Sequence, residues 1–343
     1  MSTQSGIIGA GNWIVDTTKI IDVYPAQDTL ANIGTEERNN GGGAFNILAD
    51  LAKLDASFPL HASGLIGNDP DGDWIVAHCQ SLGIDTSLLF RHPTASTSYT
   101  DVMTVRSTGR RTFFHQRGAN RFFGPQHFSW DQMQGRILYL GYLLLLDTLD
   151  AIDDQKETVA AQILRTAGER GFYRVVDLVS VERPDYSDIV NPSLPEIDLL
   201  ICNELEACRV TGIPTRDTHE SYLLEGLRQA GQILLARGVR DWVVIHLPEG
   251  AYARSSRGEE VWQGCVLLPS EQIVGTAGAG DAFAAGLLYG LHDHYDMQQN
   301  LLLGVCAAAA CLRAASTSES VSSKDDCLAL GAQFGHRDFP TRQ

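Results

Sequence analysis

Short apolar segments alternate with longer helical patterns along most of this chain, and this alternation strongly restricts its fold. Several short segments are apolar at consecutive positions, as in strands whose sheet is covered on both faces. The expected strands are 6–8, 62–66, 137–140, 174–176, 199–202 and 242–245. The expected helices are 44–54, 72–82, 153–170, 221–237, 281–291 and 301–315. Such alternation predicts an α/β fold, a three-layer α/β/α sandwich with a mainly parallel central sheet.

Two stretches, at about 13–40 and 97–117, break this pattern and read as strands of a second sheet. The second stretch alternates with a period of two and turns at 107–109, which is typical of a β-hairpin. A small sheet must bury one face, either over a ligand as a lid or against a second subunit. We therefore predict one domain over 1–343 with these lid strands inserted, and a tail after Ser316 that frays.

The balance of charges limits the partners that this chain can bind. The 343 residues include 26 Lys and Arg against 42 Asp and Glu, a formal net charge of −16. Nucleic acids and anionic membranes require clustered cations, so neither is an expected partner. We find no signal-peptide pattern and no apolar run near the ~20 residues that span a bilayer. Seven scattered cysteines indicate reduced thiols, so we expect a cytoplasmic location.

The most informative local motif places Gly278, Ala279, Gly280 and Asp281 directly before an apolar helical run, 282–291. Small residues let the backbone approach an anion closely. The first N–H groups of a helix lack partners within it and lie at the positive end of its dipole. The carboxylate can take a proton from an attacking hydroxyl, although an acid here can also simply cap the helix. The motif therefore predicts a phosphoryl-transfer site.

Polar residues near the N-terminal strands are candidates for binding a polyol. Gly42 and Gly43 precede Asn46, whose amide can both donate to and accept from sugar hydroxyls. Asp16, shortly after the first expected strand, would accept hydrogen bonds from two hydroxyls. The alternative interpretations are a flexible loop before a helix and a solvated loop acid.

Asn203 and Glu206 follow the expected strand 199–202, at the sheet edge where ligands of parallel sheets bind. Glu206 would hold water molecules of a Mg²⁺ ion, which commonly keeps several waters. The alternative interpretation is a helix cap with an acid in its first turn.

In this order the motifs resemble those of the ribokinase-like (PfkB) carbohydrate kinase family, from about Gly11 to Ala315. The pattern at 278–283 and the Gly41, Gly42 and Asn46 signature carry most of the resemblance. A turn with Gly67, Asp69 and Gly72, and the pair Asn203 and Glu206, strengthen it.

The resemblance implies transfer of the ATP γ-phosphoryl group, with Mg²⁺, to a hydroxymethyl of a sugar or nucleoside. It also implies the three-layer fold with a small β lid that often forms a dimer. By this resemblance Asp281 is the general base, and the anion hole is formed by Gly278, Ala279 and Gly280. The substrate would be bound by Asp16, Gly42, Gly43 and Asn46. The nucleotide would be bound by Asn203 and Thr276, and Glu206 would hold the metal through water.

Two positions depart from the family pattern. Gly275 stands where the family usually has an aspartate that often helps to hold a monovalent cation, which leaves dependence on such a cation open. In the family, the strand that meets the nucleotide usually ends in a Thr-x-Gly turn. Here the corresponding segment extends from His246 through Pro248 to Gly250. Proline removes a backbone donor, so we expect altered nucleotide contacts at these three residues. The alternative interpretation of His246 is a structural histidine at the end of a strand, whose polar groups have partners and which binds no ligand.

Three arginines, Arg110, Arg111 and Arg117, cluster around the second lid strand. If one of them points into the pocket, a carboxylated or phosphorylated sugar would suit it, because the guanidinium fork matches such anions. We choose Arg117 as the substrate-binding candidate, with solvated lid charge as the alternative.

We therefore predict a Mg²⁺- and ATP-dependent sugar kinase that forms a homodimer through its β lid. A nucleoside kinase on the same fold, and a sugar-binding regulator without catalysis, are the alternatives.

Overall fold

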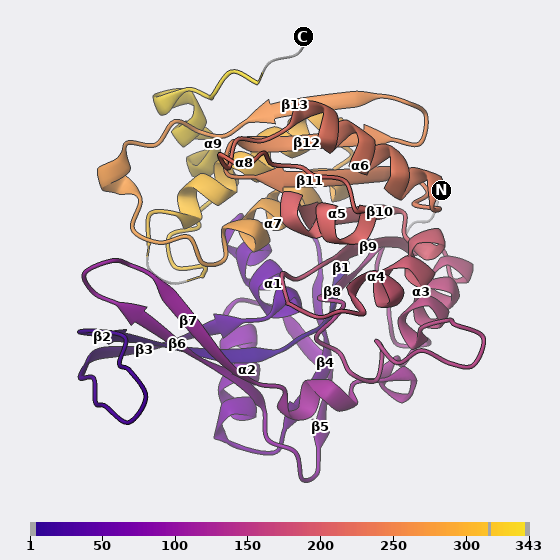
Figure 1. Cartoon of the computed structure of the whole chain (residues 1–343). Coiled ribbons are helices and arrows are strands. Elements are labelled where there is room, and N and C mark those ends of the chain that lie inside the picture. Colours follow the sequence, from indigo (N-terminus) through magenta and orange to yellow (C-terminus); the bar gives the residue numbers. More distant parts are fainter. Residues whose placement is uncertain (1–4, 315–316, 340–343) are drawn as a thin grey trace.

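The computed structural model describes residues 5–314 and 317–339, and a large β-sheet runs through its centre (Figure 1). Within these residues the sheet has nine strands in the spatial order β13-β12-β11-β10-β9-β8-β1-β4-β5. They are β1 (Ile7–Gly11), β4 (Leu60–Gly67), β5 (Asp85–His92), β8 (Ile137–Gly141), β9 (Tyr173–Asp177), β10 (Leu199–Asn203), β11 (Trp242–Leu247), β12 (Gly250–Ser255) and β13 (Glu260–Gly264). Neighbours from β5 to β11 pair in parallel, whereas β12 and β13 pair antiparallel.

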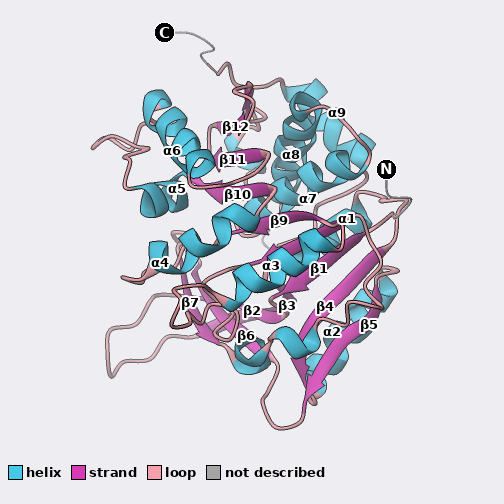
Figure 2. Ribbon diagram, turned by 90° about the vertical axis from the view of Figure 1, so that its right-hand side faces the viewer, coloured by secondary structure: helices cyan, strands magenta, loops and turns pink. Residues whose placement is uncertain are grey.

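Helices cover both faces of this sheet, which confirms the predicted three-layer sandwich (Figure 2). One face carries α1 (Gly43–Lys53), α2 (Pro70–Ser81), α7 (Ala279–His292), α8 (Met297–Cys311) and α9 (Lys324–Phe334). The other carries α3 (Val159–Glu169), α4 (Tyr186–Val190), α5 (Glu204–Thr211) and α6 (Leu224–Ala236). Because successive strand residues point to opposite faces, Ile7 lies in the first core and Ile8 in the second.

Short 3₁₀ helices complete the connections: η1 (Gly118–Phe122), η2 (Pro125–His127), η3 (Asn191–Glu196) and η4 (Ser270–Gln272). None of the helices in residues 5–314 and 317–339 is long and apolar enough to cross a membrane.

Capping residues decide where the helices begin, and they explain the differences from the predicted bounds. The predicted helix 153–170 begins only at Val159, because the Thr158 hydroxyl accepts a hydrogen bond from the N–H of Ala161. The predicted helix 301–315 begins earlier, at Met297, because Asp296 and Gln299 form a capping box. Its predicted end at Ala315 lies outside the described residues.

All six predicted strands and all six predicted helices are present, but the sequence patterns missed several elements. Strand β5 mixes polar and apolar residues at the edge of the sheet, and β12 is rich in small and polar residues. The prediction that the tail frays was wrong, since α9 is capped by Ser323 and packs against α8 through Cys327 and Leu330.

A second, small sheet projects to one side of the main body (Figure 1). Its order is β3-β2-β6-β7, with β2 (Ile14–Ile21), β3 (Ile33–Gly41), β6 (Ser98–Val105) and β7 (Arg111–Gln116). The predicted hairpin is confirmed by the antiparallel pairing of β6 and β7. On its outer face Tyr99 and Phe114 are 40% and 51% exposed.

Candidate active site

The carboxyl ends of the parallel strands bring polar residues from distant parts of the chain to one edge of the sheet. Asn12 follows β1, Tyr142 follows β8, Asp177 ends β9, Asn203 ends β10 and His246 lies near the end of β11. Ligands of open parallel sheets bind outside this edge. The candidate site is therefore fixed by the topology, and α7 points its N-terminus toward it.

Helix α7 begins in the predicted anion turn. Gly278 precedes it with φ 78°, a left-handed conformation, and a Cβ here would collide with the carbonyl of Thr317. Glycine is therefore required at this position. Among the described residues, no acceptor bonds the N–H groups of Ala279, Gly280 and Asp281, so these donors are available to an anion.

The carboxylate of Asp281, in the first turn of α7, is held by two hydrogen bonds. The Asn46 amide donates to one oxygen at 2.8 Å, and the Tyr142 hydroxyl donates to the other at 2.5 Å. Asp281 is 7% exposed. Burial raises its pKa to about 6, and the two hydrogen bonds partly offset this rise. The group is thus ionised at neutral pH but protonated in mild acid, which suits a general base.

Asn46 is itself fixed by the chain that precedes it. Its amide oxygen accepts a hydrogen bond from the Asn40 side chain at 2.7 Å, and Asn40 also donates to the Ser318 hydroxyl at 2.9 Å. Asn46 is 3% exposed. The N-terminal signature and the C-terminal anion turn are therefore joined through the amide of Asn46.

A cavity of about 210 Å³ lies beside Asp281 and is also lined by Asp177, Ser180, Asn203 and Glu206. Asn203 and Glu206 form a capping box for α5, as the alternative interpretation predicted, and the Ser180 hydroxyl donates to Glu206 at 2.8 Å. Burial raises the pKa of both Asp177 and Glu206, and for Asp177 the nearby charges of Glu206 and Asp281 add to the effect.

These acids suit a hydrated divalent cation better than a cage of direct ligands. Within the described residues, no group of three or more His, Cys, Asp or Glu side chains is arranged to hold a metal ion directly. Mg²⁺ usually keeps several waters and takes one or two carboxylates together with substrate phosphates. A dication beside Asp177 and Glu206 would also relieve the charge repulsion that raises the pKa of Asp177.

A larger, mainly apolar cavity of about 510 Å³ adjoins the first and shares Asn203, His246 and Gly280 with it. Three further residues predicted to bind the nucleotide line it: Pro248, Gly250 and Thr276. Burial lowers the pKa of His246 to about 4, so the imidazole is neutral, and it packs against Phe283 with ring centroids 5.4 Å apart. A neutral ring and an apolar wall suit a flat aromatic base.

Asp16 on β2 faces a cavity of only about 20 Å³, which the inner face of the small sheet forms together with Ala277 and Thr317. Burial raises the pKa of Asp16 to about 7; a bond from Thr100 offsets part of this rise, and the Asp281 charge adds to it. Gly42 has φ 85°, and a Cβ on Gly43 would lie 2.6 Å from the Tyr139 hydroxyl. The two glycines therefore let the start of α1 approach β1 and β8 closely.

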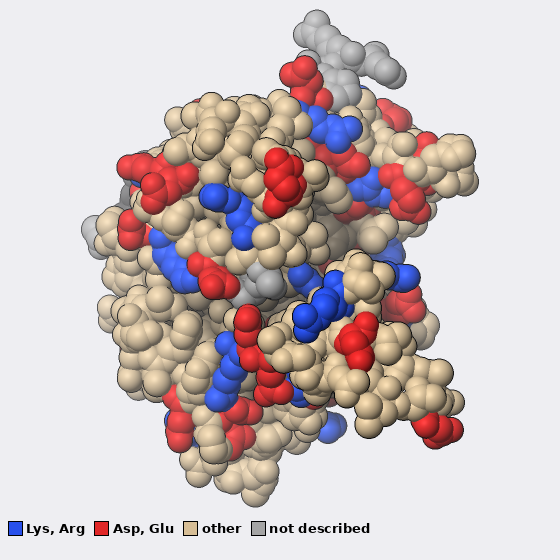
Figure 3. All heavy atoms as spheres, turned by 90° about the vertical axis from the view of Figure 1, so that its left-hand side faces the viewer, with Lys and Arg blue, Asp and Glu red and all other residues tan. Residues whose placement is uncertain are grey.

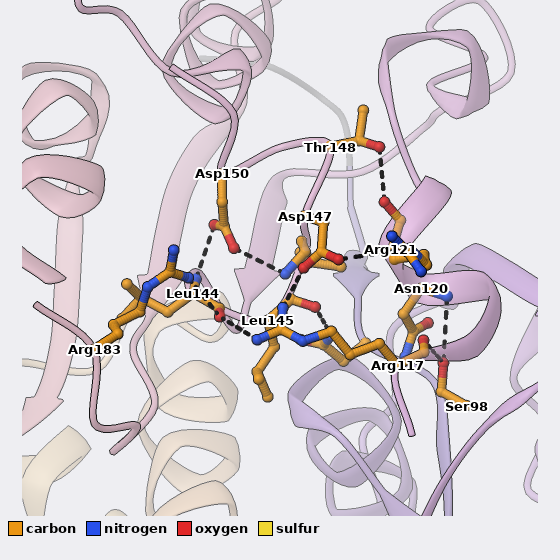
Figure 4. A network of polar contacts seen from close by, with 12 residues as sticks. Ser98, Arg117, Asn120, Arg121, Leu144, Leu145, Asp147, Thr148, Asp150 and Arg183 are labelled. Carbon is orange, nitrogen blue, oxygen red and sulfur yellow. Dashed lines mark hydrogen bonds and ion pairs between the residues drawn. The ribbon is translucent and has the colours of Figure 1, made fainter. Parts of the chain in front are cut away.

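Arg117 does not reach these cavities. Figure 4 shows its guanidinium turned to Asp147, with which it forms an ion pair, and to the carbonyl of Leu144. Asp147 also pairs with Arg121, and Asp150 anchors the same loop by accepting from the N–H of Leu144. The structure thus places Arg117 in a network that shapes the loop after β8. Arg111, the first residue of β7, lines the cavity beside Asp16 instead.

Two residues of the site were missed in the sequence. Asp177 directly follows an expected strand, and the rule that picked Asn203 would have found it. Tyr142 gave no such signal, because a tyrosine in an apolar stretch reads as core. Its bond to Asp281 joins positions 139 residues apart.

The sequence pattern of the pfkB family carbohydrate kinases matches this chain over residues 11–324. Ribokinase of Arabidopsis thaliana is 25% identical over 329 residues, which cover 94% of this chain and 80% of the plant protein. An ATP-dependent ribose-1-phosphate kinase of Halopiger xanaduensis is 26% identical over 283 residues, covering 82% and 83% respectively. The solved structure of Arabidopsis thaliana ribokinase complexed with ribose and ATP superposes with a TM-score of 0.76 at 23% identity, covering 96% of this chain and 99% of that chain.

Proposed function

This chain belongs to the pfkB family of carbohydrate kinases, and we propose that it transfers the γ-phosphoryl group of ATP to a sugar hydroxymethyl with Asp281 as general base. One observation carries the proposal: a buried carboxylate, held by Asn46 and Tyr142, lies in the first turn of a helix whose leading N–H groups are free for an anion. The larger cavity would receive the nucleotide, and the face of the small sheet that carries Asp16 would meet the sugar.

The chemistry follows from this arrangement. The sugar hydroxyl donates its proton to Asp281 as its oxygen bonds to the γ-phosphorus, and the bond from phosphorus to the β–γ bridging oxygen breaks. ADP leaves with that electron pair. The N–H groups of Ala279, Gly280 and Asp281 stabilise charge on the transferring group, since phosphoryl transfer depends mostly on positioning and charge neutralisation. General-base catalysis contributes about 10²–10⁴-fold.

We assign the remaining residues to the two substrates and the metal. Asn203 and Glu206, with Asp177, would hold a hydrated Mg²⁺, which neutralises phosphate charge when it is bound. His246, Pro248, Gly250 and Thr276 would line the nucleotide site. Gly42 and Gly43, with Asp16 and Asn46, would serve the sugar.

The small sheet would act as a lid of a single kinase domain, because its inner face borders the cavity of Asp16. Its outer face exposes Tyr99 and Phe114, which supports a homodimer through this sheet. All seven cysteines are free thiols, which supports a cytoplasmic location.

A coupled ADP-release assay with Mg²⁺ and a panel of sugars, sugar acids, sugar phosphates and nucleosides tests this function. We expect turnover with a member of the three sugar groups that depends on both ATP and acceptor. Turnover only with nucleosides would favour the nucleoside kinase, and the absence of turnover with every acceptor would contradict the enzyme.

A further inference from the structure

Arg111 is a charged residue near the proposed sugar site that has no role in the proposed mechanism. It lies on β7, opposite Thr104, and lines the cavity that Asp16, Thr18 and Asn39 also line. The sheet register places these side chains on one face, since Asp16 pairs with Asn39 and Thr18 pairs with Val102 of β6. This inner face is opposed by Ala277 and Thr317, next to the anion turn. The Arg111 side chain therefore faces the same cavity, of about 20 Å³, as Asp16, one of the proposed sugar ligands.

Arg111 differs from other arginines that are shielded from solvent. Each of the other buried or half-buried arginines has a carboxylate or carbonyl partner, as Arg174 has Asp198 and Arg216 has both Glu204 and Glu249. Arg111 is half-buried, and within the described residues its guanidinium has neither a hydrogen bond nor an ion pair. Burial lowers its pKa, and the nearby group that opposes this is a thiol, Cys311, rather than a carboxylate.

A half-buried guanidinium without a partner is costly unless an anion completes it. The arginine fork presents parallel N–H donors that match carboxylate or phosphate oxygens. Figure 3 shows basic side chains beside a hollow on the face that carries the small sheet, with acidic side chains among them. A neutral polyol would accept hydrogen bonds from this guanidinium but would leave its charge uncompensated, whereas an anion would pair with it.

We infer that the acceptor is an acidic sugar, bearing a carboxylate or a phosphate in addition to its hydroxymethyl, and that Arg111 binds this anion. The inference rests on the proposed kinase function and specifies its substrate class. Asp281 would meet the hydroxymethyl, Asp16 and Asn46 would bind other hydroxyls, and Arg111 would bind the anion from the lid.

The test uses matched acceptors that share one hydroxymethyl end: an aldose, its aldonic acid and its 1-phosphate, in pentose and hexose series. We expect the wild-type kcat/KM to favour an acidic member over its neutral aldose by at least about 10-fold. Arg111→Gln should lower kcat/KM for that acid about 100-fold and for the aldose less than about 2-fold. Comparing the acid with the phosphate identifies the anion.

Arg110→Gln is the matched control, because Arg110 is the exposed neighbour of Arg111 and does not line the cavity of Asp16. It should leave all three acceptors unchanged. The affinity of Arg111→Gln for ADP and its melting temperature should match the wild type, which excludes misfolding as the cause of any loss.

Two outcomes would overturn the inference but leave the proposed kinase function intact. The first is that neutral aldoses are turned over as well as the acids or better. The second is an equal loss for all acceptors in Arg111→Gln, which would assign Arg111 to the transferred phosphoryl group. If no acceptor is phosphorylated, calorimetry separates the two claims. Binding of an acidic sugar that depends on Arg111 would preserve the inference while the kinase function fails, and no binding of any acidic sugar would overturn both.

Discussion

The hydrogen bond from Tyr142 to Asp281 allows a quantitative prediction about the pH dependence of the enzyme. Tyr142→Phe deletes a hydroxyl that donates to the carboxylate at 2.5 Å and lowers its pKa. A hydrogen bond to a charged group in a buried site favours the charged form by roughly 1.5–3 kcal/mol. Since one pKa unit corresponds to about 1.36 kcal/mol, the pKa of Asp281 should rise by about one to two units in the variant.

The direction in which activity changes with pH follows from the need for an ionised base. With a pKa of about 6, Asp281 is mostly ionised at pH 7, and activity falls as the pH drops through 6. With a pKa of roughly 7–8 in Tyr142→Phe, the ionised fraction at pH 7 falls about 2- to 10-fold. Activity should then be recovered at about pH 9. The acidic limb of the kcat/KM profile should therefore move upward while its plateau stays nearly constant.

The assay is ADP release at low acceptor concentration from pH 5 to 9.5. Tyr173→Phe serves as the control, since the Tyr173 hydroxyl donates to Asp241 at 2.9 Å, away from the site. That variant should keep the wild-type profile. An acidic limb that does not move in Tyr142→Phe, or a loss of equal size at every pH, would refute the reasoning.

Three further substitutions test other parts of the site. Gly278→Ala places a Cβ at φ 78° against the Thr317 carbonyl, so it should lower kcat more than 10-fold and reduce the free energy of unfolding. The control Gly83→Ala has a similar φ of 72° but open space around the new Cβ, so it should cost only about 1–2 kcal/mol, less than Gly278→Ala. Equal costs in urea titrations together with a normal kcat would contradict this. Glu206→Gln should raise the Mg²⁺ concentration for half-maximal activity about 10-fold, while exposed Glu225→Gln should not; an unchanged Mg²⁺ titration would remove Glu206 from the metal site. Asn46→Ala should weaken sugar binding more than ATP binding by calorimetry, and an unchanged sugar affinity would remove Asn46 from the pocket.

The sequence predicted the layers and the anion turn because both depend on local patterns. Consecutive apolar residues in 199–202 indicate a strand covered on both faces, and small residues before Asp281 indicate an open helix start. Strand β5 and helix α9 were missed because their apolar residues are sparse and their stability comes from neighbours, as with Cys327 against α8.

The contacts that shape the site depend on tertiary structure, which no local pattern reports. Arg111 and Arg117 look alike in the sequence, yet the strand register turns Arg111 toward Asp16, whereas β7 ends before Arg117 and leaves it to Asp147. Likewise, Tyr142 meets Asp281 only because β8 ends beside β1, next to the start of α7.

The central claim is that Asp281 removes the proton from the acceptor hydroxyl, and single-turnover transfer by Asp281→Asn tests it most directly. Asparagine keeps the size of the side chain but cannot take the proton. We expect the rate with bound ATP and sugar to fall by about 10²–10⁴-fold, while sugar affinity by calorimetry stays within a few fold. A variant that transfers the phosphoryl group at nearly the wild-type rate would contradict the account.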